Sequence, residues 1–375
     1  MGRTMLKWAA IVVAVVVAAV LAYGAYVMLS YYRLDDNLPL DQAAPADSRE
    51  LPQAIDVAAS PELCVVTANL GFGAYGPDFD FFMDGGTGSV AESAEAAAAN
   101  IDGSAAAIAA ERPDFILFQE VDVDGTRSHH VDQWALLRAD FAAYGSAFAQ
   151  NYDSPFLAWP PYAPHGANRA GLVTFSGYWI DGTLRRSLPI SDGPSKLLDL
   201  DRCYSICRVR TDDGAGPDAT AGPELVLFNV HLSAYGADAS VMEAQRAMLF
   251  ADMEREREAG NYVVVGGDFN HDLLGASNEV YGNQTATEAS WAKPFDFASV
   301  PSGFTVVPKA QLDNGTFASA ATCRDAGRPY DGTNDRWVMD GFICSDDVRI
   351  SSCETLDLGF AYSDHNPVVL RFALT

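Results

Sequence analysis

Basic residues are scarce in this sequence of 375 residues. There are 24 lysines and arginines against 50 aspartates and glutamates, which gives a formal net charge of −26 at pH 7 with histidine neutral. A protein that binds nucleic acid through a broad basic surface needs the opposite balance, so this class is disfavoured. An enzyme that hydrolyses phosphate esters is not excluded, because a divalent metal ion can supply positive charge locally.

Cysteine pairs of the CxxC type and repeats of fixed period are also missing. Their absence excludes a zinc ribbon and a repeat architecture. The six cysteines are even in number, which permits disulfides in an exported domain. We expect at least one disulfide, most readily among Cys323, Cys344 and Cys353. The alternative is that each cysteine is a small buried apolar residue.

A long apolar run without charge occupies residues 8–29. Its 22 residues are enough to cross a bilayer core of ~30 Å as a helix. Arg3 and Lys7 precede it, so residues 1–7 should stay in the cytoplasm and the remainder of the chain should lie outside. The alternative is a cleaved signal peptide, although the run is longer than the apolar part of most such peptides. We expect a single-pass protein of the cell membrane with an uncleaved anchor.

The sequence after the anchor divides into a linker and one domain. Residues 30–60 contain several prolines and no apolar period, which predicts an extracellular linker. Residues 61–375 then form the folded domain. Within it, residues 212–223 are rich in glycine, alanine and proline and predict a loop. No obligate protein partner is evident.

Strand-like and helix-like stretches alternate along the domain. Strands are predicted at 63–67, 115–118, 172–175, 203–209, 225–230, 262–265, 337–343 and 368–372. Helices are predicted at 89–112, 131–144 and 241–258. This alternation indicates an α/β domain with two packed β-sheets and helices outside them.

Polar side chains interrupt or follow these apolar strands. They are Asn69, Gln119, Glu120, Asn229, His231, Asp268, Asn270, Asp340, Asp364 and His365. A single carboxylate at a strand end is usually a solvated end, and an Asp-Phe-Asn sequence is usually a turn. Asp340 is less ordinary, because it lies inside an apolar run and a buried carboxylate needs a partner. Strand ends of one sheet converge, so these residues predict one cleft.

The ordered set of motifs resembles the endonuclease/exonuclease/phosphatase superfamily. The matching motifs are TANL with Asn69, FQEV with Glu120, FNVHL with His231, GGDFN with Asp268 and Asn270, VMDGFI with Asp340, and SDHNPV with Asp364 and His365. The resemblance covers roughly residues 61–375. It implies a four-layered α/β sandwich of two mixed sheets flanked by helices, and a catalytic domain that hydrolyses phosphate esters with the help of a metal ion.

The resemblance also implies roles for individual residues. Asn69 and Glu120 would hold Mg²⁺ (Mn²⁺ is the alternative), aided by Asp364. Asp268 and Asn270 would position the attacking water and a phosphoryl oxygen. His365 would take the proton of that water, with Asp340 orienting its ring, and His231 would contact the phosphoryl oxygens or the leaving group. In-line attack of water on phosphorus requires such a base together with a cation.

Loops rich in glycine, aromatics and a few cations suggest the substrate side of the cleft. Candidate contacts to phosphate or to a head group are Asn168, Arg127, His130, His165 and Arg169, and the alternative is ordinary loop polarity. The substrate would be a phosphodiester or phosphomonoester of a lipid head group, a small molecule or a nucleic acid. We therefore expect a membrane-tethered, outward-facing, Mg²⁺-dependent phosphoesterase. The alternatives are a non-specific extracellular nuclease and a non-catalytic surface-binding module that keeps the fold.

Overall fold

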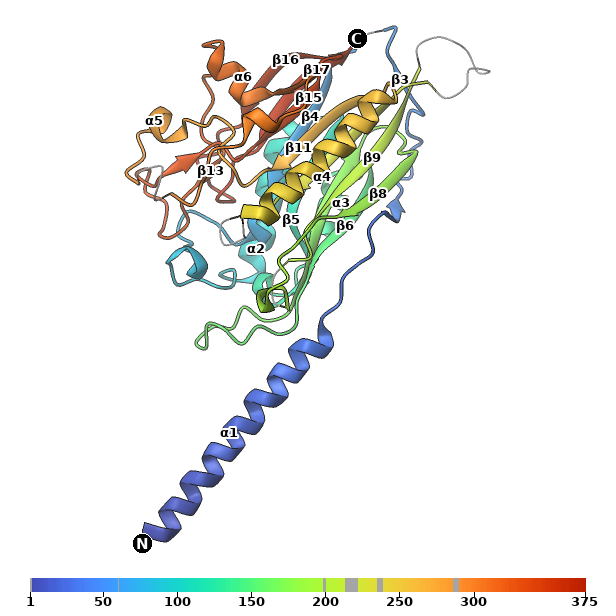
Figure 1. Cartoon of the computed structure of the whole chain (residues 1–375). Helices are drawn as coiled ribbons and strands as arrows, with labels where there is room; N and C mark the ends of the chain where they lie inside the picture. Colours follow the sequence, from blue (N-terminus) through green and yellow to red (C-terminus); the bar gives the residue numbers. More distant parts are fainter. Residues whose placement is uncertain (1, 60, 198–199, 213–221, 235–238, 286–289) are drawn as a thin grey trace.

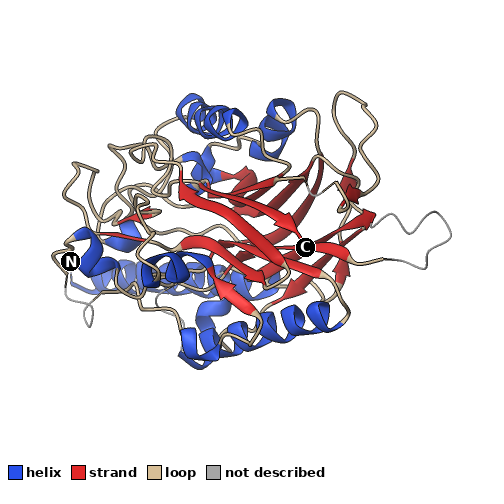
Figure 2. Cartoon of the chain, turned by 90° about the horizontal axis from the view of Figure 1, so that it is seen from above, coloured by secondary structure: helices blue, strands red, loops and turns tan. Residues whose placement is uncertain are grey.

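Two β-sheets packed face to face form the centre of the structure, with helices on both outer faces (Figure 2). The computed structural model describes residues 2–59, 61–197, 200–212, 222–234, 239–285 and 290–375. Most of the loop predicted at 212–223 lies outside this described part. The α/β architecture with two large mixed sheets is confirmed.

One sheet has seven strands in the order β16-β17-β4-β5-β7-β6-β2. These strands are β2 (Gln42–Ala43), β4 (Leu63–Asn69), β5 (Phe115–Gly125), β6 (Gly145–Asp153), β7 (Asn168–Ser176), β16 (Val348–Thr355) and β17 (Val368–Leu374). The other sheet has the order β1-β8-β9-β10-β11-β15-β12, with β3 paired to β9. Its strands are β1 (Leu38–Pro39), β3 (Ile55–Asp56), β8 (Gly182–Ser187), β9 (Cys203–Asp212), β10 (Glu224–His231), β11 (Tyr262–Asp268), β12 (Phe304–Val306) and β15 (Asp340–Ser345). A two-stranded ribbon joins β13 (Cys323–Arg324) to β14 (Arg336–Trp337).

Helices α2 (Ala94–Ala110), α3 (Gln133–Asp140) and α4 (Ala239–Glu258) cover the outer faces and complete four layers. The other helices are α1 (Gly2–Ser30), α5 (Ser277–Tyr281) and α6 (Val307–Asp313). Helices α2 and α3 bury Ile101 and Leu137 against the seven-stranded sheet, and α4 buries Leu249 against the other sheet. Between the sheets, apolar side chains such as Leu117 and Leu227 form the central core.

The six cysteines are all free and buried. The expectation of a disulfide among Cys323, Cys344 and Cys353 is therefore wrong. Cys344 and Cys353 lie in the apolar core between the sheets, and Cys323 packs with Trp337 in a separate small cluster. Burial raises the pKa of these three thiols, so they behave as apolar packing groups.

Helix α1 projects from one end of the domain (Figure 1). Among the described residues it is the one helix long and apolar enough to cross a membrane, and a signal sequence would have the same properties. The segment after it, predicted as a linker, lies along the domain. Strand β1 pairs with β8, β2 pairs with β6, and β3 pairs with β9. Two-residue strands are too short to give an apolar period, which explains why the sequence pattern does not reveal them.

Candidate active site

Five of the predicted polar residues lie at one end of the sandwich because the strand registers align them. In the first sheet Asn69 ends β4 and lies opposite Gln119 of β5. In the second sheet Asp268, the last residue of β11, lies between His231 of β10 and Asp340 of β15. The two sheets face each other, and the Asn69 amide nitrogen donates a hydrogen bond of 3.0 Å to Asp268. Residues up to 271 positions apart in sequence thus form one site.

A glycine just before Asp268 permits the close approach of β10 and β11. Gly267 has a φ of +149°, and a Cβ built there would lie 2.0 Å from the carbonyl oxygen of Val230. Only glycine fits between these backbones. Because Val230 and Gly267 immediately precede His231 and Asp268 in the paired register, this contact fixes how those two side chains leave the sheet.

Glu120 enters the site through an irregularity in β5. The pairing of β5 with β7 shifts between Phe118 and Val121, and Glu120 has a φ of +54°. Such a bulge redirects a side chain away from the regular alternation. The carboxylate accepts a hydrogen bond of 3.2 Å from Asn69. Burial raises the pKa of Glu120, the nearby Arg127 opposes this rise and Asp364 adds to it.

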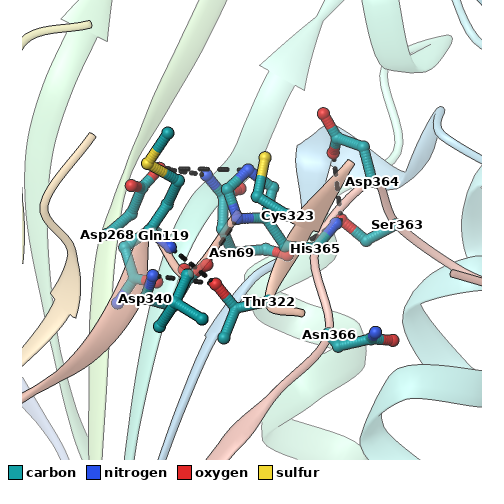
Figure 3. Close-up of polar contacts among 12 residues, drawn as sticks. Asn69, Gln119, Asp268, Thr322, Cys323, Asp340, Ser363, Asp364, His365 and Asn366 are labelled. Atoms are coloured by element: carbon teal, nitrogen blue, oxygen red, sulfur yellow. Dashed lines mark hydrogen bonds and ion pairs between the residues drawn. The ribbon is translucent and has the colours of Figure 1, made fainter. Parts of the chain in front are cut away.

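His365 and Asp340 form a direct pair. The Nδ1 atom of His365 lies 2.7 Å from Oδ2 of Asp340, whose side chain is fully buried (Figure 3). The partner that a carboxylate inside the WVMDGFI run requires is therefore this imidazole. Burial alone would lower the pKa of His365, but the Asp340 carboxylate raises it well above its usual value. Nδ1 is held by Asp340, so Nε2 is the ring nitrogen that faces the cleft, 4.0 Å from Asp268.

Asp268 is held in place on several sides. Its Oδ1 accepts a hydrogen bond from the backbone N–H of Asn270 at 2.8 Å, and its Oδ2 accepts from the amides of Asn69 and Asn270. Burial and then the Asp340 carboxylate raise the pKa of Asp268 to about 7. Asn270 has a φ of +51° and also donates to the carbonyl oxygen of Leu232. The carboxylate is therefore rigid and close to the boundary between its charged and neutral forms.

His231 contributes a neutral imidazole. Its Nε2 lies 3.7 Å from Asp268 and 3.9 Å from Glu120. Burial lowers the pKa of His231 well below its usual value, and the nearby Arg202 lowers it further. The Nδ1 atom is buried without a hydrogen-bond partner in the described part of the chain. A buried ring nitrogen of this kind is available to a bound group.

The carboxylates of the site have the chemistry of a divalent-metal centre. Glu120 and Asp364 are close enough for Asp364 to raise the pKa of Glu120, and such repulsion is relieved by a cation. Hard carboxylate oxygens with room for water are the ligands that Mg²⁺ and Mn²⁺ prefer. The oxygen of the Asn69 amide, the atom that would bind a metal ion, accepts the backbone N–H of Gly71 in this structure. The amide nitrogen faces the carboxylates of Glu120 and Asp268. Asp268, Asp340 and His365 also offer ligand atoms within 4.8 Å of one another.

The sequence profile of the Endonuclease/Exonuclease/phosphatase family matches residues 66–365, which is most of the chain. The chain belongs to the endonuclease/exonuclease/phosphatase family. It is accordingly a metal-dependent hydrolase acting on phosphate ester bonds. The resemblance of the six motifs to this family is confirmed.

Solved structures of this family share the fold. An endonuclease/exonuclease/phosphatase from Beutenbergia cavernae is 18% identical and has a TM-score of 0.51. The match covers 84% of this chain and 72% of the Beutenbergia cavernae chain. The human Nocturnin catalytic domain with a bound sulfate anion is 18% identical and has a TM-score of 0.51. The match covers 89% of this chain and 100% of the Nocturnin chain. TDP2 from D. rerio with a single-stranded DNA product is 13% identical and has a TM-score of 0.50. The match covers 83% of this chain and 98% of the TDP2 chain. None of the curated proteins matches the sequence.

The residues predicted to contact substrate lie outside this cluster of side chains. Arg127 is buried, donates to both carboxylate oxygens of Asp122 and lies 4.1 Å over the ring of Phe72. Asn168 is buried, and its amide is used by backbone groups, including the N–H of Arg127. His130 is exposed and pairs with Asp124, and Arg169 is exposed on β7.

Three residues that support the site were not predicted. The Thr322 hydroxyl accepts the backbone N–H of Asp340, and the Ser363 hydroxyl donates to the backbone carbonyl of Asn69. Burial and the neighbouring Asp364 raise the pKa of Asp84 to about 7, which places a further carboxyl beside the metal-binding side of the site. Ser363 could have been found, because it adjoins Asp364 in the SDHNPV motif. Thr322 lies in a loop and Asp84 ends a short 3-10 helix, and neither segment has a distinctive sequence pattern.

His165, a predicted phosphate contact, is instead packed in an aromatic cluster. Its ring centroid lies 5.8 to 6.1 Å from those of Phe72, Phe81 and Phe82, and its Nδ1 donates to the carbonyl oxygen of Ser89. Burial lowers the pKa of His165 to about 4. Between the usual value of ~6.5 and 4, the unfolded chain binds a proton that the folded chain does not.

The free energy of unfolding should therefore fall as the pH falls through this range. Between pH 7 and pH 5, His165 should account for about 2 kcal/mol of that loss. In His165→Phe, which keeps an apolar ring and cannot titrate, the loss measured by denaturant unfolding should be smaller by that amount. Parallel curves for wild type and His165→Phe would contradict the assignment.

Proposed function

We propose that this protein is a membrane-tethered phosphoesterase that uses Mg²⁺ and acts outside the cytoplasm. The observation that carries the catalytic part is the His365–Asp340 pair, whose second ring nitrogen lies 4.0 Å from the carboxylate of Asp268. The support for the membrane part is helix α1, which carries Arg3 and Lys7 in its first two turns and is free of charge from residue 8 to its end.

The side chains divide the reaction between them. In its neutral form, His365 accepts the proton of the attacking water at Nε2, while Asp340 holds the opposite nitrogen and stabilises the imidazolium that forms. Asp268 and Asn270 orient that water. His231, neutral because it is buried, donates to the phosphoryl oxygens or the leaving group. Glu120 and Asp364 would hold Mg²⁺, and the bound ion supplies positive charge to the phosphoryl oxygens.

The rate of hydrolysis of a chromogenic phosphodiester tests the reaction class. The full-length protein in detergent should hydrolyse it with Mg²⁺ or Mn²⁺, lose this activity when a chelator is added, and regain it with excess metal. Activity that is insensitive to chelator would contradict a metal-dependent mechanism. A protein that binds phosphodiesters without turnover would instead be the non-catalytic module.

Protease accessibility tests the orientation of the domain. Protease added to intact cells or spheroplasts should digest the globular domain and leave a short membrane-protected fragment that contains α1. Protection of the whole domain in intact cells, with digestion only after lysis, would contradict the outward orientation. A mature protein that begins after residue 30 would show that α1 is a cleaved signal sequence.

A further inference from the structure

Several exposed apolar side chains of the domain lie beside the end of α1. Among the described residues outside α1, the large apolar side chains that are exposed are Tyr32, Met83, Phe156, Trp159, Tyr162, Trp179 and Val280. Three of them, Phe156, Trp159 and Tyr162, lie in one loop, residues 154–166. Trp159 and Tyr162 are 66% and 68% exposed. This clustering of large aromatics in water is a mark of an interaction surface.

The composition of the loop 154–166 differs from that of the rest of the chain. Its sequence, SPFLAWPPYAPHG, contains no aspartate, glutamate, lysine or arginine, although acidic residues number 50 in the protein. Tryptophan and tyrosine are the residues enriched at the polar boundary of a bilayer, so this composition is typical of a segment at that depth.

Direct contacts place this loop beside the last two turns of α1. The hydroxyl of Tyr23 donates to the carbonyl oxygen of Phe156 at 2.9 Å, and the hydroxyl of Tyr26 accepts the backbone N–H of Phe156 at 2.9 Å. Tyr23 is seven residues before the end of the helix at Ser30, a distance of about 10 Å along its axis. If α1 spans the bilayer, the loop 154–166 therefore reaches the depth of the outer interface.

The chain that follows α1 is fixed to the domain, which prevents the loop from swinging away. Arg33 pairs with Asp201 at 2.7 Å and donates to the carbonyl oxygen of Leu188. Asp36 accepts hydrogen bonds from the side chain of Arg186 and the backbone of Ser187. A charged pair held by several hydrogen bonds defines one position of the helix relative to the domain.

The same loop supports the rim of the active site. The hydroxyl of Tyr162 donates to the carbonyl oxygen of Thr87, and the ring of His165 packs against Phe72. Phe72 lies in the turn that begins at Gly71, where a Cβ would come within 3.0 Å of the Asp364 carboxylate. Contacts therefore run from α1 through the loop 154–166 to the metal-binding side of the site.

We propose that residues 154–166 form a second membrane contact, with Phe156, Trp159 and Tyr162 inserted in the outer interface of the phospholipid bilayer that α1 spans. This inference rests on the membrane anchor of the proposed function. The contact holds the rim of the active site against the lipid surface, so the site faces phosphate esters presented by lipid head groups.

A fluorescent label on an introduced cysteine tests the depth of the loop. All six native cysteines are buried, so a thiol-reactive, polarity-sensitive dye goes to the introduced residue of the full-length protein. Three variants are compared in phosphatidylcholine vesicles: Trp159→Cys, Val17→Cys in α1, and the control Trp179→Cys. Trp179 is an exposed tryptophan that follows β7, whereas Trp159 precedes it, so the two mark opposite ends of that strand. Labelled wild type measures the background.

The dye at position 159 should emit at shorter wavelength than the dye at 179. It should also be quenched by nitroxide-labelled lipid and resist aqueous iodide, as the dye at 17 does. Should Trp159→Cys not fold, Tyr162→Cys gives the same measurement. The proposal is overturned if iodide quenches the dye at position 159 as strongly as the dye at position 179. This holds even if the dye at position 17 shows that α1 lies in lipid. Shielding from both quenchers also overturns it, because protein then covers the loop. Neither result depends on catalysis, so the phosphoesterase assignment is tested separately.

Discussion

Replacing His365 with alanine should reduce turnover of a phosphodiester by about 10²–10⁴-fold, the usual contribution of a positioned base. The reason is that a carboxylate orients the ring of His365, with Nδ1 at 2.7 Å from Oδ2 of Asp340. In the described part of the site, Nε2 of His365 is the one basic nitrogen positioned in this way. Steady-state kinetics on the chromogenic substrate measures the effect. Turnover within a few-fold of wild type would remove His365 from the mechanism.

Asp340→Asn should lose a large part of the same factor. Asparagine can donate to Nδ1 and so hold the ring with its proton on the wrong nitrogen. Because both side chains act through one imidazole, the double variant should be little worse than His365→Ala alone. If the two losses multiplied, Asp340 and His365 would act independently and the pairing would be wrong.

The pH–rate profile distinguishes a role of Asp340 in tuning His365 from a purely structural role, which would leave the profile unchanged. Asp340 raises the pKa of His365, so its removal should lower that pKa. A base works in its neutral form, and the rising limb of the pH–rate profile of Asp340→Asn should therefore shift to lower pH. The exposed pair His130–Asp124, with a similar contact of 2.6 Å, provides the matched control. His130→Ala and Asp124→Asn should keep the wild-type rate and profile.

Glu120→Gln should reduce turnover by about 10²-fold or more and weaken the dependence on metal. The substitution keeps the shape of the side chain and its contact with Asn69, but it removes one of the negative charges that would balance the cation. Charge stabilisation by a bound metal is worth several kcal/mol, and about 3 kcal/mol corresponds to about 10²-fold in rate. The Mg²⁺ concentration for half-maximal rate should rise.

A binding measurement separates loss of metal from loss of structure. Mg²⁺ or Mn²⁺ should raise the midpoint of thermal unfolding of the wild type, because a ligand that binds the folded state stabilises it. Glu120→Gln should lack most of this increase while keeping the midpoint without metal. Glu254→Gln, on the exposed side of α4, should behave as wild type in both respects. Near-normal turnover of Glu120→Gln at ordinary Mg²⁺ would contradict its role as a ligand.

The sequence predicts the site best where a regular strand carries a polar residue to its end. His231, Asp268 and Asp340 are of this kind, because the strand register alone brings them together. The sequence predicts the role of a side chain poorly where that side chain lies in a loop and can point either into the protein or toward a substrate. Arg127 turns inward because the buried Asp122 holds it, and nothing in the spacing of these two residues distinguishes that arrangement from an arginine facing a substrate.

Strands β8 and β16 were not predicted from the sequence, for a related reason. In β8 and β16, buried and exposed positions do not alternate regularly, and few residues are apolar. These strands lie near the margins of their sheets, where packing on one face is thin and a strong apolar pattern is not required. Asn69 shows the same limit within the site, since the orientation of its amide depends on the backbone turn at Gly71.

The pairing of β1 with β8 and of β2 with β6 determines where the protein can be shortened. These two short strands cover one outer margin of each sheet, and both are supplied by the segment between α1 and residue 56. A fragment that starts at residue 61 would leave the backbone N–H and C=O groups of β6 and β8 open to other chains, an arrangement that favours self-association. A soluble form for crystallisation should therefore begin close to residue 31, which removes the apolar helix and retains both protecting strands.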